Sequence, residues 1–168
     1  MLLYLMRHGI AVDRNDPKCP PEAKRPLTEK GVKRTAAAVA GLARMITAPD
    51  VIVSSPYRRA GETAELVADA FELSHKDIVY TKALLPEANP SELFAFLEKY
   101  NGRSVMCTGH APNLDLVLAS AIGAKRMSVT GMKKAAVACL NFSALRAGLA
   151  DLLWLAEPRL LRALAGED

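Results

Sequence analysis

The segment LLYLMRHGIA, residues 2–11, opens on five apolar side chains and then changes abruptly to a cation, an imidazole and a glycine. The apolar run from Leu2 to Met6 predicts a buried strand. Arg7, His8 and Gly9 would then lie at the carboxyl end of that strand. A surface turn needs neither the arginine nor the histidine, and a solubilising charge does not need the glycine. The trio therefore indicates a functional site.

Short apolar runs alternate with helical patterns along the rest of the chain. Strands are predicted at residues 51–53, 78–80, 104–107, 135–142 and 152–156, and helices at 32–46, 57–71, 91–99, 113–122 and 158–164. Thr28, Ser91 and Asn113 are the expected N-caps of three of these helices. Strands that alternate with helices of about 10 to 15 residues indicate an α/β fold. We expect a single-domain, three-layer sandwich, with a mostly parallel sheet and helices on both faces.

Basic and imidazole side chains follow three of the predicted strands. Arg7 and His8 follow the first strand, Arg59 follows the second, and His110 follows the run at 104–107. The carboxyl ends of parallel strands meet at one edge of a sheet, where ligands bind in folds of this class. Arginine matches phosphate oxygens, and histidine acts as a donor, base or nucleophile near neutral pH. The pattern predicts a site for phosphoryl transfer, with Arg58 facing solvent.

The composition excludes several classes of protein. The 168 residues carry a net charge of +4, and 51% of them are apolar. The apolar runs are far shorter than the roughly 18 residues of a membrane span, and the start of the chain lacks a signal-peptide pattern. The three cysteines fit reduced thiols. We expect a cytoplasmic monomer. The basic pairs are scattered and lack interleaved aromatics, which favours an anionic ligand over nucleic acid.

Five motifs occur together in one order: YLMRHGIA, RPLTEKG, SSPYRRAGETAE, LLPEANP and GHAPNL. With them, the chain resembles the histidine phosphatase superfamily, which has the phosphoglycerate mutase-like fold, and within it the SixA-type phosphohistidine phosphatases. The resemblance covers nearly all of residues 1–168. It implies that His8 is a nucleophile that is transiently phosphorylated, and that Arg7, Arg59 and His110 hold the phosphoryl oxygens. It also implies that no metal or other cofactor is needed.

The chain departs from the mutases of this superfamily. Mutase-type members often carry Glu-Ser after Arg-His-Gly and an Asn shortly beyond, whereas this chain has Ile10, Ala11 and Arg14. Their glutamate acid has only a positional candidate here, Glu87 in LLPEANP. A missing acid fits a substrate whose leaving group departs easily, and phosphohistidine is of that kind. A cysteine phosphatase is excluded, because the residue six positions after Cys107 is asparagine.

Several functions stay open at this stage. The first is removal of phosphate from phosphohistidine in a protein of the histidine phosphotransfer type, and the second is hydrolysis of a small phosphate ester. A third is a phosphate-binding module with little catalysis. A nucleic-acid-binding domain has only the basic pI near 9.0 in its favour. Arg25 could reach a substrate from its loop, and Lys133 and Lys134 are expected to guard a solvated sheet edge.

Overall fold

The computed structural model describes residues 1–125 and 129–166 of the chain. Its strands are β1 (Leu2–Arg7), β2 (Val51–Ser54), β3 (Val79–Tyr80), β4 (Ser104–Gly109), β5 (Val137–Phe142) and β6 (Ala150–Ala156). Its α-helices are α1 (Glu29–Leu42), α2 (Arg58–Ala70), α3 (Pro90–Leu97), α4 (Asn113–Ala121) and α5 (Pro158–Ala165). None of the helices in these two ranges has the length and apolar character that crossing a membrane requires.

The six strands form one sheet in the order β3-β2-β4-β1-β5-β6. The pairs among β1 to β4 are parallel, which confirms the mostly parallel sheet. Strand β5 runs antiparallel to both of its neighbours. Only seven residues separate β5 from β6, and so short a connection joins antiparallel strands, because a parallel crossover needs about a dozen residues or more.

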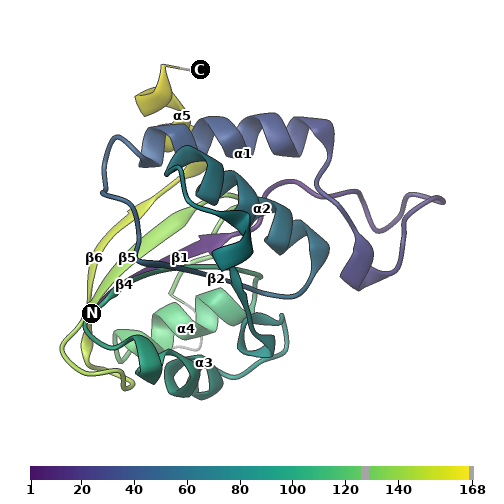
Figure 1. The fold of residues 1–168 in the computed structure, drawn as a ribbon. Coiled ribbons are helices and arrows are strands. Elements are labelled where there is room, and N and C mark those ends of the chain that lie inside the picture. Colours follow the sequence, from purple (N-terminus) through teal and green to yellow (C-terminus); the bar gives the residue numbers. More distant parts are fainter. Residues whose placement is uncertain (126–128, 167–168) are drawn as a thin grey trace.

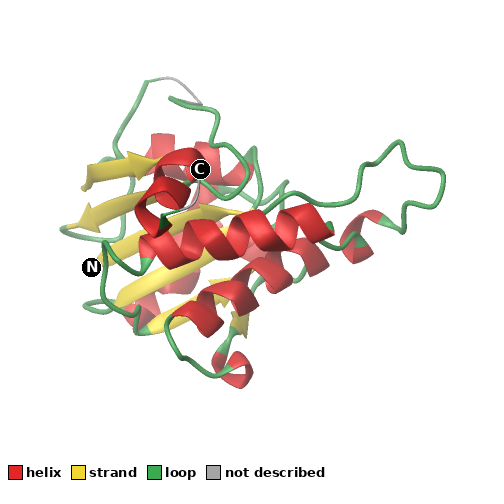
Figure 2. Cartoon of the chain, turned by 90° about the horizontal axis from the view of Figure 1, so that it is seen from above, coloured by secondary structure: helices red, strands yellow, loops and turns green. Residues whose placement is uncertain are grey.

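Helices cover both faces of the sheet, so the three-layer α/β sandwich is confirmed (Figure 1). Helices α1, α2 and α5 lie on one face, and α3 and α4 lie on the other (Figures 1 and 2). Alternate residues of β1 face the two layers: Tyr4 and Met6 join the core under α1 and α2, while Leu3 and Leu5 join the core over α4. Burial on both faces explains why this strand is continuously apolar.

The N-caps of two helices differ from the sequence prediction. Helix α3 begins at Pro90, which suits a first helical position, and the Glu92 carboxylate accepts the backbone N–H of the N-cap residue Asn89 at 3.1 Å. Ser91 as the cap is therefore wrong. Asn113 as a cap is also wrong, because it is the first residue of α4 and its buried side chain donates to the Ala88 carbonyl at 2.8 Å.

The segment between β1 and α1 projects from the body of the protein and returns at Thr28 (Figure 2). Thr28 caps α1 as predicted, accepting the backbone N–H of Gly31 at 2.9 Å. A Cβ on Gly31 would lie 2.0 Å from the carbonyl oxygen of Ile10, so only glycine lets α1 begin this close to the end of β1. The motif RPLTEKG thus anchors the projecting segment beside the strand end that carries His8.

Candidate active site

His8 lies directly after β1, at the edge where parallel strands end. Its backbone N–H donates to the Gly109 carbonyl at 3.0 Å, which joins the ends of β1 and β4. The side chain is buried, with 7% of the residue exposed. A Cβ on the next residue, Gly9, would lie 2.2 Å from Thr35 Oγ1 of α1. The glycine of the Arg-His-Gly trio therefore lets α1 pack close to the site.

Hydrogen bonds fix the tautomer of His8. Its Nδ1 lies 2.7 Å from the Gly9 carbonyl oxygen, which can only accept a hydrogen bond, so Nδ1 carries the proton. The lone pair is then on Nε2, which accepts from Nε of Arg59 at 3.1 Å. Burial is the largest cause that lowers the pKa of His8 to about 3, and the charges of Arg59 and Arg7 act in the same direction. A neutral imidazole with an unprotonated Nε2 is the nucleophilic form.

Arg59 comes from the first turn of α2 and is almost fully buried, with 2% exposed. Its Nε donates to His8, its Nη1 donates to the Glu22 carbonyl at 2.9 Å, and its Nη2 donates to the Glu22 carboxylate at 2.8 Å. A guanidinium whose Nε already lies beside Nε2 of His8 can move to an oxygen of a phosphoryl group there. The adjacent Arg58 points into solvent and pairs with Glu62 at 2.7 Å, as expected.

His110 follows β4 and lies beside His8, with the two ring centroids 5.1 Å apart. Its Nε2 lies 2.8 Å from the hydroxyl of Ser55, which follows β2. Its Nδ1 is buried and has no hydrogen-bond partner among the residues that the structure describes. Burial, followed by the neighbouring His8 and Arg59, lowers the pKa of His110 to about 2. A buried ring nitrogen without a partner is one that a bound ligand can satisfy.

Arg7 provides a fourth, half-buried group at this edge. Its Nη1 donates to the Met132 carbonyl at 2.6 Å, while its Nε is buried and finds no partner within residues 1–125 and 129–166. Asp115 of α4 accepts the backbone N–H of Met132 at 2.8 Å. This bond fixes the position of Met132, whose carbonyl binds Arg7. Burial lowers the pKa of Arg7, and the charge of Asp115 opposes that shift. The Arg7 guanidinium is therefore positioned with its buried Nε–H still available for a ligand.

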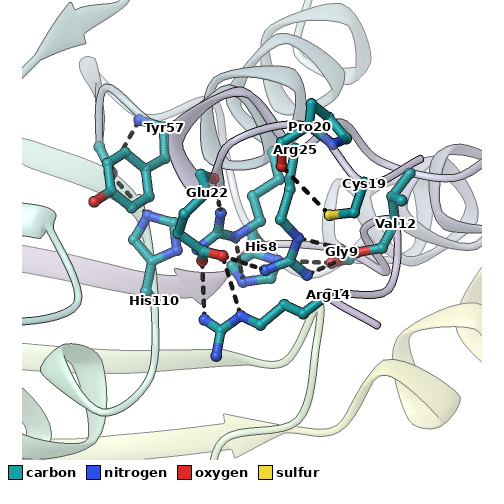
Figure 3. A network of polar contacts seen from close by, with 12 residues as sticks. His8, Gly9, Val12, Arg14, Cys19, Pro20, Glu22, Arg25, Tyr57 and His110 are labelled. Carbon is teal, nitrogen blue, oxygen red and sulfur yellow. Dashed lines mark hydrogen bonds and ion pairs between the residues drawn. The ribbon is translucent and has the colours of Figure 1, made fainter. Parts of the chain in front are cut away.

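Glu22 is the centre of an ion-pair network that the sequence does not reveal (Figure 3). Its carboxylate accepts from Arg14 at 2.9 Å, from Arg25 at 2.7 Å and from Arg59 at 2.8 Å. Hydrogen bonds from Arg14 first, and then from Arg25, lower the pKa of Glu22 to about 2. The carboxylate therefore stays ionised. It orients Arg59 and ties the projecting segment to the site.

A cavity of about 400 Å³ opens at this edge and is lined by Arg7, His8 and Arg59 together with Arg25 and Lys134. Three of the predicted site residues thus share one cavity, and His110 stacks at a tilt beside His8. Glu87 is exposed and is not among the residues that line the cavity. Lys134, which was predicted to guard a sheet edge, also lines the cavity.

Arg25 reaches the site, but its guanidinium is largely occupied. Two of its nitrogens donate to the Val12 carbonyl, at 3.0 and 2.7 Å, and a third donates to Glu22. Only the spacing of Glu22 and Arg25, three residues apart, could have suggested that pairing. The two residues hold the shape of the projecting segment and place the Glu22 carboxylate against Arg59.

The two neutral histidines make stability depend on pH. Unfolded histidines titrate near pH 6.5, whereas His8 and His110 titrate near 3 and 2 in the fold. Between those values the unfolded chain binds protons that the folded chain does not, so stability falls as pH falls. We expect each histidine to contribute about 1.4 kcal/mol per pH unit to this slope between pH 6 and 4.

Urea unfolding of the wild type and of His8→Gln, measured across that range, checks the slope. The variant keeps His110 but lacks one buried histidine, so its slope is expected to be smaller by about 1.4 kcal/mol per pH unit. Equal slopes for the two proteins would show that His8 titrates normally in the fold.

Comparison with known proteins agrees with this geometry. A model of the histidine phosphatase superfamily (branch 1) matches residues 3–85, which include Arg7, His8 and Arg59. An uncharacterized protein of Picosynechococcus sp. is 36% identical over 117 residues, which are 68% of each chain.

Solved structures extend the likeness over the whole sheet. A protein histidine phosphatase, SixA, complexed with tungstate has a TM-score of 0.82 at 22% identity, over 95% of this chain and 98% of that one. The alpha-ribazole phosphatase of Shigella flexneri has a TM-score of 0.75 at 18% identity, over 94% and 97% of the two chains. At these identities the likeness shows a shared fold. Together with the sequence matches, it shows that this chain belongs to the histidine phosphatase superfamily, branch 1.

Proposed function

We propose that this protein is a metal-independent phosphatase that removes phosphate from phosphohistidine in proteins, with His8 as the nucleophile. One observation carries the proposal. Nε2 of His8 holds a lone pair in a buried site. Two buried nitrogens of the residues around it, Nε of Arg7 and Nδ1 of His110, have no partner in the described part of the chain. A module that only binds phosphate does not need an unprotonated imidazole at that place.

The reaction takes place in two displacements. The substrate reacts with its other ring nitrogen already protonated. The Nε2 lone pair of His8 forms a bond to phosphorus while the P–N bond of the substrate breaks, and the substrate imidazole leaves neutral, keeping that proton. Water then attacks phosphorus, the P–Nε2 bond breaks, His8 is again neutral, and phosphate leaves with both protons of the water as H2PO4−. Arg7 and Arg59 neutralise the oxygens in both steps, and His110 contributes a hydrogen bond. Arg59 exchanges its bond to His8 for a phosphoryl oxygen as the new P–N bond forms.

The carboxylates near the site favour a phosphoramidate substrate. Glu22 is held ionised by three arginines, which makes it a poor proton donor. Glu87 is exposed. A hydrogen bond from the Asn113 side chain to the Ala88 carbonyl holds its loop to the segment that follows His110. A substrate imidazole can depart without a strong acid, whereas an alkoxide cannot. The structural likeness to a protein histidine phosphatase adds support.

Hydrolysis of a small phosphate ester is the second candidate. The exposed Asp13 lies among the residues that line the catalytic cavity, so a carboxylate is present on its rim. The likeness to an alpha-ribazole phosphatase points the same way. These two candidates share the nucleophile and the phosphate ligands and differ in the leaving group.

Rates on three substrates separate these candidates. We would measure kcat/KM, in buffer with EDTA, for a phosphohistidine peptide, for p-nitrophenyl phosphate and for an alkyl phosphate. The phosphohistidine peptide is expected to react at least about 100 times faster than the alkyl phosphate, because its leaving group needs less protonation. A preference for the alkyl phosphate would contradict the proposal, as would activity that EDTA removes and Mg²⁺ restores.

Glu87→Gln tests the remaining candidate for the acid. If Glu87 protonates the leaving group, the variant loses about 100-fold on the alkyl phosphate, less on p-nitrophenyl phosphate and least on phosphohistidine. We expect a small effect on phosphohistidine. Asp13→Asn is the matched comparison, because it neutralises the carboxylate that lines the cavity. Equal loss on all three substrates would give Glu87 a structural or binding role instead.

A further inference from the structure

A second cavity, of about 650 Å³, lies beside the catalytic one and is lined mainly by basic side chains. We call it the basic cleft. It lies between α1, the segment before β5, and α5, and its cations beyond Arg7 are Arg34, Lys133, Lys134, Arg159 and Arg162. Glu157 is the one carboxylate among the described residues that line it, and it pairs with Lys133 at 2.6 Å. The cleft therefore carries a large excess of positive charge.

The basic cleft adjoins the catalytic cavity. Arg7 and Lys134 line both of them. The residue after Lys134, Ala135, donates its backbone N–H to the carbonyls of Arg7 and His8, at 2.9 and 3.2 Å. These bonds fix the segment that separates the cleft from the nucleophile. A molecule whose phosphoryl group is at His8 therefore presents its neighbouring groups to the cleft.

The fold holds the two sides of the cleft in place. Helix α5 packs against α1 (Figure 1), and a Cβ on Gly41 of α1 would lie 1.7 Å from the Leu161 carbonyl oxygen of α5. That close approach sets Arg34 on one side and Arg159 on the other. The basic side chains are therefore carried by packed helices and by a strand end.

The exposure of these side chains decides what kind of anion suits them. Arg34, Lys133 and Arg159 are exposed. An exposed ion pair contributes little to binding, so one small anion would be held weakly. An acidic protein surface contacts several of these cations at once. The electrostatic attractions between its carboxylates and the cations add together, and they also raise the rate of association. No aromatic side chain is among the described residues that line the cleft, so stacking of nucleic-acid bases has no platform there.

We propose that the basic cleft binds an acidic surface of the phosphoprotein substrate next to its phosphohistidine, which rests on the proposed function. The cleft thus selects among phosphohistidine proteins by the charge beside the modified residue. Apart from Arg7, which belongs to the catalytic site, catalysis of small substrates does not use the cleft. Arg34 and Arg159 act on substrate binding and not on the chemical step.

Two labelled peptides of the same length test this proposal. Each has one histidine, flanked by six glutamates in the first and by six glutamines in the second. Binding of the unphosphorylated forms is measured by fluorescence anisotropy at low salt, and kcat and KM are measured with the phosphorylated forms. For the wild type we expect at least about tenfold tighter binding of the acidic peptide, lost as salt rises, and a correspondingly lower KM.

The double variant Arg34→Gln, Arg159→Gln is expected to lose that preference while keeping kcat and the rate on p-nitrophenyl phosphate. The matched control is Lys76→Gln, Lys99→Gln, which removes the same charge from exposed residues near β3 and α3. Equal binding of the two peptides by the wild type, or equal losses in both double variants, would overturn the proposal.

An oligonucleotide of matching charge completes the test. If it bound more tightly than the acidic peptide and lost that binding in the Arg34 and Arg159 variant, the cleft would be a nucleic-acid site, and the proposal would be wrong. Peptide binding that follows the expected pattern without hydrolysis of either phosphorylated peptide would support the cleft and reject the proposed function. Failure of the cleft proposal and failure of the proposed function therefore give different results.

Discussion

His8→Ala is expected to reduce kcat/KM by at least about a thousandfold on every phosphoryl substrate, because it removes the atom that forms the covalent bond. His8 lies after the last residue of β1 and not within the core of the sheet. The fold should therefore survive the change. Turnover is measured on p-nitrophenyl phosphate and on a phosphohistidine peptide, with urea unfolding as the check of folding.

A folded His8→Ala protein that kept more than about a tenth of the wild-type rate would remove His8 from the role of nucleophile. The variant lacks a histidine whose pKa is held at about 3. It should therefore be less sensitive to acid than the wild type, which provides an independent sign that the replaced side chain was buried and neutral.

Arg59→Ala is expected to reduce kcat/KM by about a thousandfold, which is the effect of losing a preorganised donor to the oxygens of the transition state. The residue is 2% exposed, and its Nε lies 3.1 Å from Nε2 of His8. Its loss also leaves Glu22 with one arginine fewer, so unfolding must be measured beside activity.

Arg58→Ala is the matched control for this change. Arg58 is the neighbouring residue of the same helix and also an arginine, but it points to solvent and pairs with Glu62. We expect its loss to change kcat/KM by less than about threefold, since exposed ion pairs are weak. Similar losses in the two variants would mean that the effect comes from net charge and not from contact with the phosphoryl group.

The strands and the residues at their ends could be predicted from the sequence because they depend on local pattern. A continuously apolar strand followed by Arg7 and His8 is visible without any tertiary information, and so are the strand before Arg59 and the strand before His110. Once the strands are taken as parallel, topology alone brings these ends together. The structure places all four residues at one edge of the sheet.

The Glu22 network could not be predicted, because its contacts depend on how a long segment folds back. Glu22 and Arg59 are 37 residues apart, and a glutamate in a loop rich in proline has no periodic pattern to mark it. Lys134 was missed for a related reason: only the pairing of β5 beside β1 brings it to the cavity. The cap of α3 was misplaced because Asn89 and Ser91 both suit that role, and Pro90 decides between them.

The most direct measurement is the site of phosphoryl attachment during turnover. The wild type is mixed briefly with a labelled phosphoryl donor and quenched in alkali, and the labelled peptide is sequenced by mass spectrometry. We expect a label that acid removes and alkali does not, on Nε2 of His8, because Nδ1 is engaged with the Gly9 carbonyl. A label on Nδ1 or on another residue, or turnover without any labelled protein, would contradict nucleophilic catalysis by His8.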